Sequence, residues 1–276
     1  RMVAQKLSEQ IGQAVVVDNR VGASGNIGAE IVARAPADGY TLLTLTASHP
    51  ANNAVLTSVP FDLTRDFAAL TQMTTQPYLL VAHPALPASG VKELIALARS
   101  EPGTLHYGSS GIGTLQHLAA VMFGVMSKTD LVHVPYKGGA QVLPDLVAGR
   151  LQFFFSVMLS SLPHVRSGKL RTLAVSSAKR SAIAPEVPTV AESGLPGFAV
   201  DNWYGVALPA GTPAPVVNRL HREIVRVLRA DDVRERFAQE GSESAGTTPQ
   251  EFAATVRNDL ARWRTYAKQA GAKAGG

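Results

Sequence analysis

The sequence contains no cysteine, which excludes disulfides, thiolate metal sites and a cysteine nucleophile. No hydrophobic run approaches the ~20 residues that a membrane-spanning helix needs. Charged residues make up only 17% of the 276 positions, whereas disordered chains are rich in charge and poor in apolar residues. With 46% hydrophobic residues, the chain can bury the core of one large domain or of two lobes. We therefore expect a folded globular protein.

Clustered basic charge is also missing, although the net charge is +5. The densest basic region, residues 219–236, is interleaved with acidic residues, which indicates a solvated helix face. We therefore expect no nucleic acid partner. None of the seven histidines shows H-x-H or H-E-x-x-H spacing, so we expect no metal, and no motif indicates a cofactor.

The N-terminus lacks the features of a signal peptide. It opens with Arg1-Met2-Val3-Ala4-Gln5, a pattern typical of the middle of a helix. We expect that upstream residues precede Arg1 in the full protein and that a signal peptide has been removed.

Short apolar runs alternate with amphipathic stretches along the chain, which is the signature of an α/β fold. Predicted strands lie at 14–17, 40–45, 78–82, 105–108, 131–134, 151–155 and 170–175, and predicted helices at 27–35, 91–99, 114–126 and 139–148. The nearly continuous apolar character of the strands indicates burial on both faces, and hence a largely parallel sheet covered by helices.

Two amphipathic helices are predicted near the C-terminus. Thr212 is expected as N-cap of the first, with Pro213 as its first residue. The second is expected to begin with a capping box at Thr248-Pro249-Gln250-Glu251.

Two segments with proline and glycine, 83–87 and 205–213, are typical of chain crossings between lobes. They predict one lobe from residues 1–85 and 205–276, a second lobe from 86–204, and a ligand cleft between them.

Four polar segments are candidates for ligand contact. The loop 107–114, which contains Ser109, Ser110 and Thr114, follows a predicted strand and opens a helix, so it can hold an anion at a positive helix end. Gly22–Gly28 occupies a similar junction, where an anion cradle and a tight turn both fit. For 134–140, with Tyr136, a ligand-contacting and a structural role are equally compatible with the sequence. Asp201 can accept a hydrogen bond from a ligand or form a turn.

An enzyme is the main alternative, namely an α/β hydrolase that uses Ser109 or Ser110 with His117. A G-x-S-x-G elbow from Gly108 requires glycine at 112, where Ile112 stands, and no clear orienting acid is present. No Gly-Lys-Ser/Thr follows the loop either, which argues against a nucleotide site. We therefore expect a binding protein and not an enzyme.

In combination, these segments resemble the substrate-binding proteins of tripartite tricarboxylate transporters, the Bug family. The resemblance runs from about Leu7 to Trp263 and rests on the segments VVVDNRVGASGNIGAE, ADGYTLL, LHYGSSGIGTLQHLA, VHVPYKGGAQVLPDLVAGRLQ, LPHVRSGKLRTLAVSSAKR, PEVPTVAESGLPGF and PAGTPAPVVNRL.

The resemblance implies a periplasmic type II binding-protein fold, with two lobes of mixed sheets flanked by helices. It implies a protein that captures a dicarboxylate, tricarboxylate, acidic amino acid or aromatic acid for the membrane components of a transporter, or for a sensor. Nothing in the sequence demands more than a monomer. The ligand contacts implied are Ser109, Ser110, Gly111, Gly113, Thr114, Thr46, Ser48, His49, Tyr136, Gly138 and Gly139, with Asp201 as a further candidate.

Two features depart from the family pattern. The first strand and its Pro-Phe-x-x-Gly-Gly-type loop do not occur in this sequence, so one of the two loops that grip the carboxylate is missing from it. Many members also carry Phe-Asp where this chain has Phe155-Ser156. We expect Ser156 to disfavour a ligand amine.

Overall fold

The computed structural model describes residues 1–20, 22, 25–56 and 58–269. The chain divides into two compact units, unit 1 with Arg1–Thr75 and Trp203–Arg262, and unit 2 with Gln76–Asn202 and Trp263–Gly276. The chain passes between the units within strand β2 (Phe67–Ala82), strand β7 (Asp201–Pro209) and helix α10 (Pro249–Gln269). The predicted boundaries after residues 85 and 204, and the cleft, stay predictions.

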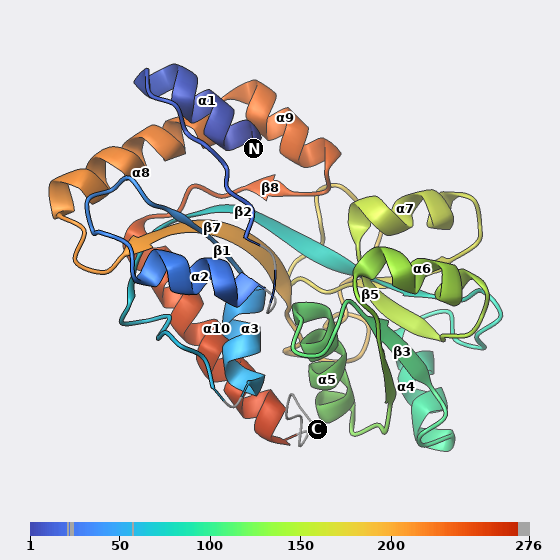
Figure 1. Cartoon of the computed structure of the whole chain (residues 1–276). Coiled ribbons are helices and arrows are strands. Elements are labelled where there is room, and N and C mark those ends of the chain that lie inside the picture. The colour runs from blue at the N-terminus through green and yellow to red at the C-terminus, as the bar shows by residue number, and fades with distance from the viewer. Residues whose placement is uncertain (21, 23–24, 57, 270–276) are drawn as a thin grey trace. The chain divides into compact units, whose positions relative to one another are not determined.

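Unit 1 is built on antiparallel strands. Strand β1 (Leu43–Thr46) pairs with β7, from Leu43 opposite Ala207 to Thr46 opposite Tyr204. The first part of β2 lies next to β7 in the sheet order and pairs with β8 (Glu243–Ser244). Figure 1 shows α1 (Met2–Ile11), α8 (Ala214–Leu228) and α9 (Asp231–Gln239) on one side of these strands, and α2 (Asn26–Ala33), α3 (Ser48–Val55) and α10 on the other.

Apolar side chains fill the space between the strands of unit 1 and their helices. One buried cluster joins α1, β2, β7, α8 and α9 through Leu7, Leu70, Val206, Leu208, Ile224, Val227, Leu228 and Val233. On α10, the ring of Phe252 packs edge-on against Trp203, with centroids 5.3 Å apart. The indole N–H of Trp203 donates a hydrogen bond of 2.7 Å to Asp259. These contacts fix α10 against β7.

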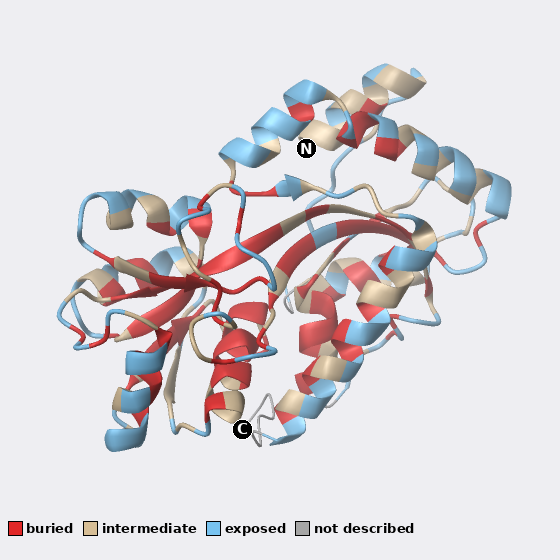
Figure 2. Ribbon diagram, turned by 180° about the vertical axis from the view of Figure 1, so that it is seen from behind, coloured by how far each residue is buried: buried red, intermediate tan, exposed pale blue. Residues whose placement is uncertain are grey.

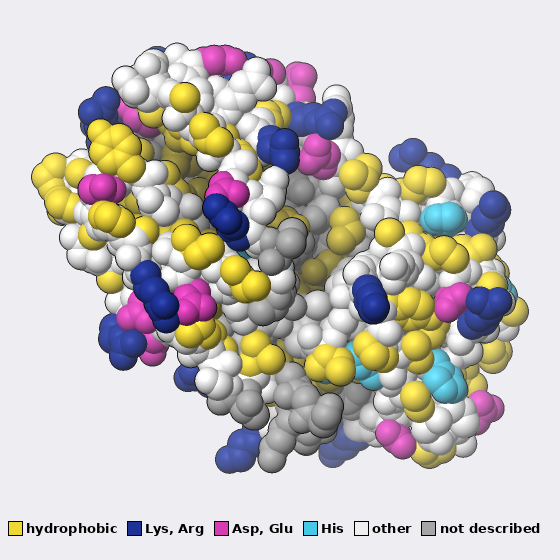
Figure 3. All heavy atoms as spheres, in the orientation of Figure 1, with side chains coloured by type: hydrophobic (Ala, Val, Ile, Leu, Met, Phe, Trp, Pro, Cys, Tyr) yellow, Lys and Arg dark blue, Asp and Glu magenta, His cyan; other side chains and the backbone are white. Residues whose placement is uncertain are grey.

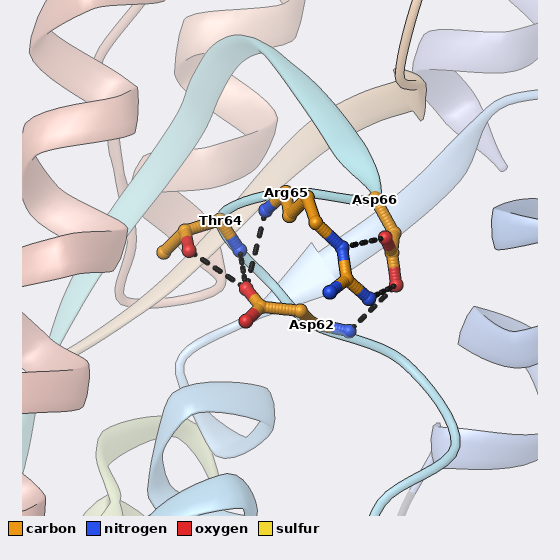
Figure 4. Close-up of polar contacts among 4 residues, drawn as sticks. All are labelled: Asp62, Thr64, Arg65 and Asp66. Atoms are coloured by element: carbon orange, nitrogen blue, oxygen red, sulfur yellow. Dashed lines mark hydrogen bonds and ion pairs between the residues drawn. The ribbon is translucent and has the colours of Figure 1, made fainter.

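A polar turn leads the chain into β2 (Figure 4). One carboxylate oxygen of Asp62 accepts hydrogen bonds from the N–H and hydroxyl of Thr64 and from the N–H of Arg65. The Thr64 hydroxyl and N–H are the main reasons why the pKa of Asp62 lies below its ordinary value. Asp66 closes the turn by accepting from the Asp62 N–H at 2.8 Å. Short polar side chains that bond the local backbone are typical of such turns.

Unit 2 contains a mixed five-stranded sheet in the order β4-β3-β5-β2-β6. Strand β3 (His106–Ser109) runs parallel to β4 (Val132–Pro135) and β5 (Phe153–Val157). The second part of β2 runs antiparallel to β5 and β6 (Arg171–Val175). The expectation of a largely parallel sheet was therefore wrong, because an apolar run reports burial on both faces and not strand direction.

Helices cover both faces of this sheet, namely α4 (Val91–Ser100), α5 (Leu115–Ser127), α6 (Gly139–Val147) and α7 (Met158–Arg166). In β5, the consecutive residues Phe153, Phe154 and Phe155 are all at most 1% exposed. Phe153 and Phe155 both contact Phe123 of α5, whereas Phe154 belongs to the opposite core cluster with α6 and α7. Figure 2 shows the strands as largely buried.

Most predicted strands are present, but 14–17 is not one of them. This segment has no strand assignment, and Val16 is 84% exposed. The prediction was wrong because four apolar residues can lie extended without a neighbouring strand. Thr212 was also wrongly predicted as an N-cap: its hydroxyl donates to the Pro209 carbonyl, and Pro213 occupies the N-cap position of α8 without a side-chain hydrogen bond.

The predicted capping box of α10 is confirmed. The Thr248 N–H and hydroxyl donate to the Glu251 carboxylate at 2.8 and 2.9 Å, and the Glu251 N–H donates to the Thr248 hydroxyl. Within the described ranges, no helix is long and apolar enough to cross a membrane. On the face drawn in Figure 3, Lys and Arg side chains are interspersed with Asp and Glu.

Candidate functional site

The loop 109–114 connects β3 to α5 at the carboxyl edge of the parallel strands of unit 2. Because β3 and β4 are parallel, with Ser109 opposite Pro135, the segment after β4 lies beside this loop. The Tyr136 N–H donates to the Ser109 carbonyl at 3.0 Å. The fold thus brings two of the predicted binding segments, 109–114 and 136–139, together at one edge, which is where α/β sheets commonly bind ligands.

Ser109 is fully buried and its hydroxyl is saturated within unit 2. Its oxygen lies 3.0 Å from the Gly111 carbonyl, 3.1 Å from the Gly111 nitrogen and 2.7 Å from Nε2 of His133. A hydroxyl has one hydrogen, and the Gly111 carbonyl can only accept it. Because the Ser109 hydroxyl donates its hydrogen to the Gly111 carbonyl, His133 Nε2 must carry a hydrogen and donate it to the Ser109 oxygen. The hydroxyl therefore holds the loop and is not directed at a ligand.

The other two hydroxyls of the loop are also engaged inside the unit. The Ser110 hydroxyl donates to the side-chain oxygen of Gln116. The Thr114 hydroxyl donates to the Gly111 carbonyl at 2.7 Å and accepts from the His117 N–H at 3.4 Å. Thr114 is thereby the N-cap of α5, as expected for threonine at this position.

Two histidines, His117 and His133, contact the loop as neutral rings. His117 and His133 stack with ring centroids 4.1 Å apart. Burial lowers the pKa of His117 to about 3, with a further contribution from His133, and burial lowers the pKa of His133 to about 4. Nδ1 of His117 accepts a hydrogen bond from the Gly113 N–H at 3.2 Å, which requires that nitrogen to be unprotonated. Near neutral pH the rings carry no charge.

The N-terminal end of α5 is a source of positive potential at this loop. The first N–H groups of a helix have no intrahelical acceptor, and the aligned peptide dipoles place about half a positive charge there. Helix α5 has 13 residues, and Leu115 and Gln116 contribute N–H groups of the first turn. Such an end is suited to bind a carboxylate without lysine or arginine.

Tyr136 lies beside this loop, but its hydroxyl is turned toward α6. It donates a 2.6 Å hydrogen bond to Asp145, which also pairs with Arg150 at 2.7 Å. Burial and the Asp145 carboxylate raise the pKa of Tyr136 to about 12. Gly138, with a φ of 155°, caps the first turn of α6, which begins at Gly139. The phenol is therefore engaged with α6, and the roles of Tyr136, Gly138 and Gly139 as ligand contacts stay predictions.

Ser156 and Asp201 occupy different positions in unit 2. Ser156 lies on β5 with no exposed surface, and its hydroxyl donates to the Val157 carbonyl. Asp201 is half-buried at the start of β7. Their roles as ligand contacts stay predictions.

In unit 1, Thr46, Ser48 and His49 gather where β1 meets α3. Nδ1 of the buried His49 accepts from the Thr46 N–H at 3.0 Å and lies 3.0 Å from the Thr46 hydroxyl. Burial lowers the pKa of His49, against the opposing influence of the Thr46 and Gly25 backbones. His49 is thus a neutral ring that fixes the turn, while Thr46 and Ser48 are half-buried.

The glycine loop 22–28 precedes α2 in the same unit. The Gly25 N–H donates to the Gly22 carbonyl at 2.9 Å, and Gly25 caps α2 with a φ of 96°. Its α-carbon faces the His49 ring, since a methyl group placed there would lie 3.1 Å from Nε2. Residues 21, 23 and 24 lie outside the described residues. The interpretation of this loop as an anion cradle stays a prediction.

The hydrolase alternative paired Ser109 or Ser110 with His117. The structure instead places Ser109 against His133, and His117 against the Gly113 N–H. Within the described ranges no carboxylate hydrogen-bonds to either ring, so the orienting acid of a catalytic triad is missing there. Sequence reasoning missed His133, because only the β3–β4 pairing brings Tyr107 and His133 into register.

In the described part of the chain, no group of three or more His, Asp or Glu residues is arranged to hold a metal ion. A cavity of about 500 Å³ in unit 2 is lined by β6, α7 and residues 184–187, and includes none of the candidate residues.

Comparison with known proteins connects this arrangement to a family. Residues 1–272 match the model of the tripartite tricarboxylate transporter family receptor. The chain is 39% identical over 265 residues to the UPF0065 protein in the tcbD-tcbE intergenic region of Pseudomonas sp. (strain P51), covering 96% of this chain and 79% of that protein.

Solved structures show the same similarity in three dimensions. Rpa4515 of R. palustris with adipate is 38% identical, with a TM-score of 0.86 over 98% of this chain and 91% of that one. MatC (Rpa3494) of Rhodopseudomonas palustris with bound malate is 28% identical, with a TM-score of 0.83 over 96% of this chain and 92% of that one. Both are structures of carboxylate complexes.

Proposed function

Because the chain belongs to the tripartite tricarboxylate transporter receptor family, we propose that it captures a small carboxylate on the N-terminal end of α5 and releases it unchanged. The ligand carboxylate accepts hydrogen bonds from the N–H groups of the first turn of α5. The periplasm is the compartment in which this capture takes place, and the membrane components of a tripartite transporter receive the ligand. The protein acts as a monomer.

One observation supports this proposal: the polar side chains of the β3–α5 loop are bonded inside unit 2, and the two histidines that contact the loop are neutral. The hydroxyls of Ser109, Ser110 and Thr114 are all used to hold the loop. A ligand carboxylate therefore meets a fixed helix end. Charge-assisted hydrogen bonds to such N–H groups contribute roughly 1.5–3 kcal/mol each.

The two similar structures support the chemical class. Rpa4515 holds adipate and MatC holds malate, which are dicarboxylates of six and four carbons. We extend this class to the present chain. Thr46, Ser48, His49, Tyr136, Gly138, Gly139, Ser156 and Asp201 remain the other proposed ligand contacts.

A charge placed on the loop tests the proposal directly. Ile112 is 49% exposed in the middle of the loop, so both asparagine and aspartate can replace it without a buried penalty. Ile112→Asn and Ile112→Asp differ only in charge. Two unit charges 4 Å apart repel by about 1 kcal/mol in water and about 4 kcal/mol near a protein surface. We therefore expect Ile112→Asp to bind dicarboxylates at least about fivefold more weakly than Ile112→Asn.

Isothermal titration of refolded protein with adipate, succinate and malate provides the measurement. Equal affinities of the two variants for every acid that binds the wild type would place the carboxylate elsewhere. A wild type that binds none of the acids would contradict the proposed function as a whole.

A further inference from the structure

Ile112 is the side chain that the β3–α5 loop presents to solvent. It is 49% exposed, whereas Ser109, Gly113 and Leu115 around it are buried. The polar side chains of the loop all turn inward, to Gly111, His133, Gln116 and His117. Toward a ligand, the loop therefore offers backbone N–H groups and one hydrocarbon side chain.

Single exposed apolar residues are common on protein surfaces, so the exposure of Ile112 alone does not indicate ligand contact. Its position in the loop is the more informative feature. It stands between Gly111 and Gly113, whose φ values of 133° and 78° are unfavourable for any other residue. Two residues later, Thr114 caps α5. Ile112 therefore belongs to the segment that leads directly into the first N–H groups of α5, where the proposed function puts the carboxylate.

Two of the polar side chains in unit 2 are engaged with protein groups. The Asp145 carboxylate is held by Tyr136 and Arg150. The Ser156 hydroxyl has no exposed surface and donates to the Val157 carbonyl. The Ile112 side chain itself can form no hydrogen bond, so a hydroxyl or ammonium group of the ligand that lies against it loses water without a replacement from this side chain, which disfavours binding.

We propose that Ile112 is a specificity-determining residue, which selects carboxylic acids with an unsubstituted hydrocarbon chain over their hydroxylated or aminated counterparts. This inference rests on the proposed function and names the ligand class of the same site. A site with an apolar wall discriminates against an added hydroxyl by up to about a hundredfold, and a half-exposed side chain by less.

Matched ligands and matched variants test this inference. Succinate and malate differ by one hydroxyl, and glutarate and glutamate by one ammonium group. Ile112→Val and Ile112→Thr give side chains of nearly equal shape that differ by a methyl against a hydroxyl. We expect the wild type to prefer succinate and glutarate over malate and glutamate by about tenfold.

The two variants should differ in the ratio of their affinities for succinate and malate. Ile112→Val lowers the affinity for all four acids by a similar small factor. It keeps the preference for succinate over malate within about twofold of the wild-type value, because the valine side chain is still apolar. Ile112→Thr lowers the preference for succinate over malate by about three- to tenfold, because its hydroxyl can bond the malate hydroxyl. Leu159→Thr, at an exposed leucine of α7 that is 53% exposed, serves as the control and leaves the affinities as in the wild type.

Three outcomes are decisive. A succinate-to-malate preference that is lower in Ile112→Thr than in Ile112→Val supports the inference. Equal ratios for these variants, or a wild type that prefers malate, overturn it while carboxylate capture still stands. Absence of binding by the wild type to any of the four acids and to adipate overturns the proposed function and this inference together.

Discussion

The hydroxyl oxygen of Ser109 and Nε2 of His133 lie 2.7 Å apart, although 24 positions separate the two residues in the sequence. The contact ties the loop after β3 to the neighbouring strand β4. Because Ser109 is fully buried, this hydrogen bond has little competition from water. The pair is therefore a latch that holds the loop in the geometry required at the end of α5.

Removal of the Ser109 hydroxyl should destabilise the loop and lower the affinity for the ligand. Ser109→Ala leaves the Gly111 N–H and His133 Nε2 without their buried acceptor, which costs roughly 1–3 kcal/mol of unfolding free energy. We expect a matching fall in stability by urea titration and a several-fold weaker affinity for dicarboxylates. Ser110→Ala is the comparison, since Ser110 is only half-buried, and it should cost less.

An ester panel separates this structural role from a catalytic one. No hydrolysis is expected from the wild type. Turnover that disappears in Ser109→Ala would contradict the latch and restore the hydrolase alternative.

The two neutral histidines predict a stability that falls in mild acid. In the folded protein their pKa values are about 3 for His117 and about 4 for His133, below the ordinary value of 6.5. Between these limits the unfolded chain binds more protons than the folded one, so stability is full above pH 6.5 and is lost as the pH falls toward 3. His133→Phe keeps an aromatic ring stacked on His117 and removes one of the two titrating imidazoles.

Unfolding free energies at pH 7.5 and pH 5 measure this effect. We expect the wild type to lose stability between the two values, and His133→Phe to lose about 1 kcal/mol less, after allowance for the partial exposure of the ring. A pH dependence equal in both proteins would show that His133 is not the titrating group.

Gly205 of β7 is expected to tolerate no side chain. A methyl group there would lie 2.2 Å from the Phe252 ring, which is fully buried against β7. Gly205→Ala should therefore cost about 1–3 kcal/mol of unfolding free energy. Gly90 is the matched control, because no atom lies within 4 Å of the corresponding position and its φ of −156° suits alanine. Gly90→Ala should change stability by less than about 0.5 kcal/mol. Equal losses in both variants would argue against close packing of α10 on β7.

Sequence patterns predicted the local elements of the site well. The apolar stripe of α5, with Leu118 and Phe123, is buried, and Thr114 caps the helix. What the patterns could not predict depends on strand order. Ser109 and His133 meet because β3 and β4 are neighbours, and nothing in either segment specifies that pairing. The family resemblance indicated the fold, while the inward direction of the Ser110 hydroxyl required the position of Gln116.

The most direct test of carboxylate capture is titration of refolded wild-type protein with adipate in a calorimeter, followed by analysis of the acid by NMR. We predict saturable binding at one site per chain and recovery of unchanged adipate. A hundredfold excess over the dissociation constant should also stabilise the protein by about 2.7 kcal/mol. No heat from adipate, succinate or malate, or chemical conversion of the bound acid, would contradict the proposed function.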